Sequence, residues 1–97
     1  MVNNKDREEF RAELVEVLAG VAKNKQLLAK FLHDVLTPTE FDEIAARWQI
    51  VKLLHAGVPH HEIAKRTHTA VATVTRGSRE MKDPQGGFRL ALRAMKL

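Results

Sequence analysis

Residues 60–81 read HHEIAKRTHTAVATVTRGSREM, and this stretch decides the fold that we expect. Its first part, residues 60–67, carries Ile63 and Ala64 on one side of a short helix. A tight turn follows, and a second helical segment runs from residue 71 to about residue 81. Two short helices joined by such a turn are typical of a helix-turn-helix, whose second helix enters the major groove of DNA.

The second segment is rich in β-branched residues, and its propensity alone would permit a strand. We predict a helix, with Val74 on its buried side, because no other segment of the chain offers a partner strand. His68 stands in the turn at a place that often carries glycine, so we expect a backbone cost there.

Apolar residues at helical spacing predict further helices before the motif, within residues 7–21 and 26–36. A third helix should begin at Pro38, because Thr37 can cap it and Glu40 can complete a capping box. The apolar stripe that we assign to this helix comprises Phe41, Ile44, Ala45, Trp48, Val51, Leu54 and His55, with Gly57 and Pro59 ending it.

A last helix, marked by Phe88, Leu92 and Met95, should run to the end of the chain after the break at Asp83-Pro84. The predicted fold class is therefore all-α with about six helices. We expect one domain, residues 1–97. Its parts are core helices in 1–57, the helix-turn-helix in 58–82 and a terminal helix in 84–97.

The length and composition of the chain favour assembly into a homodimer. A chain of 97 residues with 44% hydrophobic but only 5% aromatic residues can build a modest aliphatic core, so a homodimer is expected. The apolar stripe in residues 27–36 is broad, and either packing within one chain or a partner chain explains it. Cysteine is absent, and neither a signal peptide nor a membrane-spanning run is apparent, so we expect a cytoplasmic protein with no membrane partner.

Charge is unevenly placed along the chain. From Arg47 onward there are ten basic residues and three acidic ones, an excess of +7. A basic half suits a polyanion such as double-stranded DNA, and a solvated basic face explains the charge equally well. The residues that we expect at a DNA interface are Thr69, Ala70, Val71, Ala72, Thr75 and Ser78, flanked by Lys65, Arg66, Arg79 and Lys82.

Signs of catalysis or of a metal site are lacking in the sequence. The adjacent His60 and His61 do not have the spacing of a helical metal site, and no glycine-rich phosphate loop or nucleophile elbow is present. We therefore expect that the protein is not an enzyme and that it binds no metal ion and no cofactor.

Four motifs resemble the tryptophan repressor family: Leu36-Thr37-Pro38-x-Glu40, Arg47-x-x-Ile50-Val51, Leu54-x-x-Gly57 and Ala72-Thr73-Val74-Thr75-Arg76-Gly77-Ser78. The resemblance runs from about Leu36 to Lys82. It implies an intertwined dimer with a helix-turn-helix reading head. It also implies a DNA-binding repressor controlled by an amino-acid corepressor such as L-tryptophan.

By position, the resemblance implies that Arg47 and Arg76 flank the indole and that Gly77 lets the ligand approach the backbone. Thr37, with the backbone carbonyls of Asp34 and Leu36, would lie near the amino group. Glu80 replaces a serine of the family pattern, so it either pairs with the ligand's ammonium or crowds the pocket. The alternatives are a family member with altered or lost ligand dependence, and a helical protein-interaction module.

Overall fold

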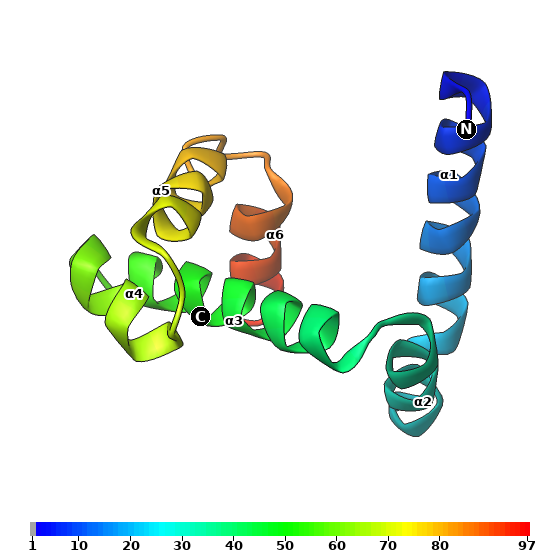
Figure 1. Cartoon of the computed structure of the whole chain (residues 1–97), viewed down its shortest axis with the longest axis horizontal. Helices are drawn as coiled ribbons and strands as arrows, with labels where there is room; N and C mark the ends of the chain where they lie inside the picture. The colour runs from blue at the N-terminus through cyan, green and yellow to red at the C-terminus, as the bar shows by residue number, and fades with distance from the viewer. Residues whose placement is uncertain (1) are drawn as a thin grey trace. The chain divides into compact units, whose positions relative to one another are not determined.

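The computed structural model describes residues 2–97, and this part of the chain is helical with no strand (Figure 1). The helices are α1 (Asn4–Val21), α2 (Lys25–Val35), α3 (Pro38–His55), α4 (His60–Thr67), α5 (Val71–Glu80) and α6 (Gly87–Ala94). The predicted all-α fold with six helices is confirmed. No helix among these residues is both long enough and apolar enough to cross a bilayer. The chain divides into two compact units, one ending at Phe41 and the other spanning Asp42–Leu97.

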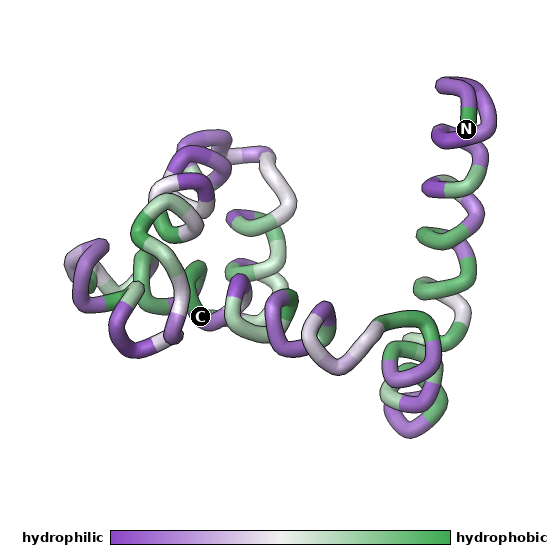
Figure 2. The backbone as a smooth tube through the Cα atoms, viewed as in Figure 1, coloured by the Kyte–Doolittle hydropathy of each residue, from purple (hydrophilic) through white to green (hydrophobic). Residues whose placement is uncertain are grey.

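In the first unit, α1 packs against α2. Asparagine caps both helices: the Asn3 side chain accepts a hydrogen bond from the Asp6 amide at 2.8 Å, and Asn24 accepts one from the Leu27 amide at 3.1 Å. Apolar residues recur turn by turn along α1 (Figure 2). Neither helix has a buried residue, so this unit has no core of its own.

The predicted capping box at the start of α3 is confirmed. The Thr37 amide donates to Glu40 Oε1 at 2.9 Å, and the Glu40 amide donates to Thr37 Oγ1 at 3.1 Å. The bond from the Thr37 backbone is the main cause that holds the Glu40 pKa below its usual value, and the Thr37 side chain acts in the same direction.

The second unit is built around α3, with α4, α5 and α6 packed on it (Figure 1). One cluster of buried residues joins α3, α4 and α5, and consists of Ile50, Ile63, Ala64 and Val74. The other joins α3 to the end of α5 and to α6, and consists of Val51, Met81 and Leu92. The burial predicted for Ile63, Ala64 and Val74 is confirmed.

The apolar stripe assigned to α3 is wrong in part. Ile44 is 49% exposed and Ala45 is also exposed, whereas Ile50, outside the assigned stripe, is 1% exposed. Apolar residues occur on more than one side of this helix, so their spacing does not select the buried side. Packing against α4 and α5 selects it.

The terminal helix is shorter than predicted, because it begins at Gly87 and ends at Ala94. Before it, the Asp83 carboxylate accepts a hydrogen bond from the Gln85 amide at 2.9 Å and holds the chain in a turn. After it, Lys96 adopts a left-handed conformation with φ 58°, and the Leu97 amide donates to the Leu92 carbonyl at 2.9 Å. Helical dihedrals therefore do not continue to the last residue.

Candidate nucleic-acid interface and ligand pocket

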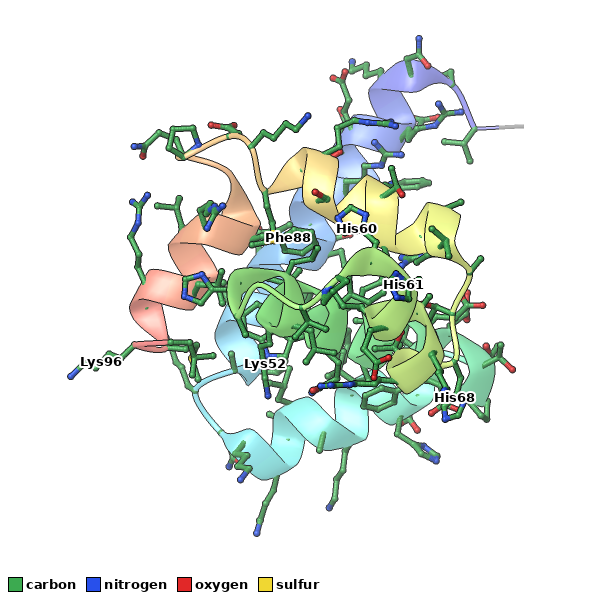
Figure 3. All side chains as sticks on the ribbon, turned by 90° about the vertical axis from the view of Figure 1, so that its left-hand side faces the viewer. Lys52, His60, His61, His68, Phe88 and Lys96 are labelled. Atoms are coloured by element: carbon green, nitrogen blue, oxygen red, sulfur yellow. The ribbon has the colours of Figure 1, made fainter. Side chains whose placement is uncertain are left out.

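Helices α4 and α5 pack directly on each other, as a helix-turn-helix requires. His68 ends α4 in the left-handed region, with φ 56° and ψ 40° (Figure 3). This conformation lets the Thr69 amide donate to the Ala64 carbonyl at 3.0 Å, so the last turn of the helix is satisfied. His68 thus has a side chain where the turn favours glycine, and the backbone cost expected there stays a prediction.

One side of α5 is exposed and carries small side chains. Val71 is 50% exposed, and Ala70, Ala72 and Thr75 are also exposed. Thr75 donates its hydroxyl hydrogen to the Val71 carbonyl at 3.1 Å. Its methyl group and the oxygen's lone pairs remain for an outside partner.

Thr69 and Ser78 are half-buried, whereas the other residues expected at the interface are exposed. The Thr67 hydroxyl donates to the Ile63 carbonyl at 2.8 Å and lies 2.8 Å from the Thr69 hydroxyl. Because the single hydroxyl hydrogen of Thr67 is donated to the Ile63 carbonyl, the Thr69 hydroxyl is the donor in the bond between the two threonines. Thr69 therefore has only acceptor capacity left.

The basic residues expected beside this face are exposed: Lys65, Arg66, Arg79 and Lys82. Arg66 differs from the others because its Nε donates to Glu62 Oε1 at 2.9 Å, one helical turn away. A phosphate contact by Arg66 must share or replace that ion pair, which is weak because both side chains are partly exposed.

The structure brings Arg47, Arg76 and Gly77 together. With Ile50, Thr73 and Phe88 they line what we call the arginine pocket. Its cavity volume is only about 10 Å³, room for about one water molecule. A Cβ atom on Gly77 would lie 3.3 Å from Ile50 Cγ2, so this glycine also lets α5 approach α3 closely.

Glu80 lies in a neighbouring cavity of about 420 Å³, which shares Arg76 and Phe88 with the arginine pocket and includes Asp83. Arg76 and Phe88 thus form the boundary between the two spaces. Thr37 belongs to the other unit, where its hydroxyl oxygen caps α3.

Phe88, like Ile50 and Thr73, lines the arginine pocket although the sequence did not predict it at the ligand site. Its spacing in the sequence marks it as an inward-facing residue of α6, and it does pack beside Val51, Met81 and Leu92. Figure 3 shows its ring directed towards the body of the unit. Its meeting with Arg47 and Arg76 depends on how α6 folds back, which residue spacing within α6 does not record.

Comparison with known proteins finds a matching family and several similar relatives. The family described as Trp repressor protein matches residues 11–96. The chain is 35% identical over 83 residues to a Trp operon repressor homolog of Pasteurella multocida, covering 84% of this chain and 79% of that relative. It is 34% identical over 89 residues to the homolog of Haemophilus influenzae strain PittEE, covering 91% and 86%.

A third relative is similar over a shorter stretch. The Trp operon repressor homolog of Actinobacillus succinogenes is 46% identical over 54 residues, and the match spans 55% of this chain and about half, 54%, of that relative. The other two matches extend well beyond this stretch, and the family match takes in all six helices in whole or in part. The chain belongs to the Trp repressor family of transcriptional regulators.

Proposed function

We propose that the protein is a dimeric, sequence-specific DNA-binding repressor that uses an aromatic amino acid, in the first place L-tryptophan, as corepressor. The observation that carries DNA binding is the α4–α5 pair, because burial of Ile63, Ala64 and Val74 leaves a smooth face of small side chains on α5 exposed. Such a face fits a major groove without a clash.

The chemistry of this face suits base edges. The exposed methyl groups of Ala72 and Thr75 can contact thymine methyls, and the Thr75 oxygen can accept from an adenine or cytosine amino group, directly or through water. Lys65, Arg79 and Lys82 are exposed, and we expect them to neutralise phosphates at the edges of this face.

The arginine pocket supports the ligand. Guanidinium planes at Arg47 and Arg76 can stack on an aromatic ring and pair with a carboxylate, while Ile50 and Phe88 supply apolar surface. Because the pocket holds only about 10 Å³, an indole requires its lining side chains to move, and the neighbouring cavity of about 420 Å³ offers space to Arg76 and Phe88. Binding would then restrain α5, which bears Arg76, and shift the population to the DNA-competent form.

Selection of random DNA duplexes, with and without L-tryptophan, tests the proposal. Wild-type protein should enrich one sequence, and enrichment should depend on the ligand. Ala72→Leu should lose preference for that sequence by about tenfold or more, because the larger side chain clashes in the groove, while non-specific affinity changes little.

The matched control is Ala94→Leu, the same substitution at an exposed position at the end of α6. It should leave the preference intact. Equal preference in Ala72→Leu and wild type would show that this face of α5 does not read the bases.

A further inference from the structure

A cavity of about 430 Å³ lies between the end of α3, the turn after α5 and α6. Three cationic side chains line it, those of Lys82, Arg89 and Arg93, together with the imidazole of His55, and none of its lining side chains is acidic. Met81 and Leu92 supply apolar wall. We call it the cationic cavity; its volume is in the range of small-molecule sites, roughly 300–1,000 Å³.

Two of the three cationic groups are held in place by main-chain oxygens. Arg89 Nε donates to the Met81 carbonyl at 2.8 Å, and Arg93 Nη2 donates to the Pro84 carbonyl at 2.7 Å. A guanidinium has five N–H donors, so each arginine keeps further donors after this bond. The anchored side chains have lost rotamer freedom already, which lowers the entropic cost of binding an anion.

No acidic side chain forms an ion pair with these groups in the part of the chain that the structure describes. The close contacts between basic and acidic side chains there are the Arg66–Glu62 ion pair and the His33–Asp34 hydrogen bond, and neither involves a residue of the cationic cavity. Positive charges gathered around one cavity repel each other, so an anion that enters it relieves that repulsion.

A second cavity of about 290 Å³ adjoins the cationic cavity and shares Met81, Lys82 and Arg89 with its lining. The second cavity adds Ser78 and His60 from α5 and α4. Polar and basic groups therefore extend from α6 across the end of α5 to the start of α4.

We propose that the cationic cavity binds phosphate groups, with Arg89 and Arg93 of α6 as its principal donors. The planar guanidinium fork matches two oxygens of a phosphate, and several cations in one site favour an anion of two or more negative charges. A free pyrophosphate-type anion and the phosphodiester backbone of bound DNA share this chemistry. Only the second source rests on the proposed DNA-binding function.

The first arm of the test is calorimetric titration of inorganic pyrophosphate at constant ionic strength in chloride. Wild-type protein should bind, and Arg93→Gln should weaken binding about tenfold or more, as expected for loss of a charged donor. Lys82→Gln, on another wall, should act in the same direction. The matched control is Lys96→Gln, since Lys96 is exposed, points away from the body of the unit and does not line the cavity (Figure 3).

The second arm measures affinity for duplex DNA against salt concentration. If the cavity takes a backbone phosphate, Arg93→Gln should reduce the slope of log K against log salt by about 0.9, while Lys96→Gln leaves it unchanged. Circular dichroism confirms that each variant is folded.

A difference between Arg93→Gln and Lys96→Gln in the pyrophosphate arm assigns a free anion, and one in the DNA arm alone assigns the backbone. The proposal is overturned if the two variants behave alike in both arms. Failure of the protein to bind any DNA would reject the proposed function. The pyrophosphate titration would then decide whether the cationic cavity binds phosphate groups.

Discussion

At the scale of the residue, His68 shows how one backbone conformation defines the motif. With φ 56°, it lets the chain reverse between α4 and α5 and directs the Thr69 amide to the Ala64 carbonyl. This conformation costs a residue with a Cβ atom about 1–2 kcal/mol, whereas glycine adopts it without that cost. We therefore expect His68 to lower the free energy of unfolding relative to glycine at this position.

His68→Gly should raise the free energy of unfolding by about 0.5–1 kcal/mol, because the relief of strain exceeds the extra entropy of glycine in the unfolded chain. Urea unfolding followed by circular dichroism measures it. His61→Gly, in the first turn of the same helix, has no positive φ to relieve and should give no gain. A destabilised His68→Gly variant would contradict this account of the turn.

We expect Glu80 to influence which ligand the proposed site accepts. It lines the cavity that Arg76 and Phe88 share with the arginine pocket. If its carboxylate pairs with the ligand's ammonium, indole-propionate should bind at least tenfold more weakly than L-tryptophan, and Glu80→Ser should narrow that difference.

If Glu80 instead blocks the site, wild type should bind neither compound and Glu80→Ser should gain binding of L-tryptophan. Calorimetric titration of both proteins with both compounds separates these results. Four titrations without binding, on folded protein, would reject the tryptophan site and leave the DNA interface to be tested separately.

At the scale of the element, the start of α3 is set by the capping residue Thr37 and by Glu40 in the first turn. The reciprocal hydrogen bonds between Thr37 and Glu40 satisfy two amides that have no partner within the helix. The charge on Glu40 also lies at the positive end of the helix dipole. A local motif thus fixes where the long central helix begins.

Glu40 should make stability depend on pH. Its pKa is lower in the folded protein than in the unfolded chain, so its contribution is fully present above the unfolded pKa and is lost as pH falls through the folded pKa. The difference in unfolding free energy between wild type and Glu40→Gln should therefore shrink on acidification. Glu43→Gln, exposed on the same helix, is the control for general charge effects.

A constant difference between wild type and Glu40→Gln across that pH range would contradict the role of the carboxylate. Thr37→Ala, which removes the cap itself, should cost about 1 kcal/mol at neutral pH.

At the scale of the whole molecule, the two units differ in how much they bury. The second unit holds every buried residue that the structure describes, whereas α1 and α2 hold none. Phe10 is 60% exposed and Val15 is 65% exposed. Helices with so much apolar surface in water gain stability when a second copy covers them, which supports the proposed dimer.

Phe10→Glu should abolish or strongly weaken the dimer, because it places a charge in the proposed contact. If the dimer is obligate, the variant should also unfold at lower denaturant concentration. Arg11→Glu, at the exposed neighbouring position, should leave association intact. Sedimentation equilibrium measures both. In a monomeric protein the two substitutions would have similar, small effects.

The sequence by itself determined the elements whose signals are local. The capping residues around Thr37, the apolar spacing at Ile63 and Val74, and the reversal at His68 lie within a few residues of what they specify. The helices at 60–67 and 71–80 were therefore predicted nearly to the residue. The family resemblance likewise follows from contiguous motifs.

Only the tertiary structure decided which of several apolar sides is buried and which distant residues meet. Ile50 is buried and Ile44 is not, because α4 and α5 pack on one side of a helix that is apolar on more than one. Phe88 joins Arg47 and Arg76, and Arg93 reaches the Pro84 carbonyl, because α6 folds back after a turn. These contacts depend on the path of the chain between elements, which periodicity within an element does not encode.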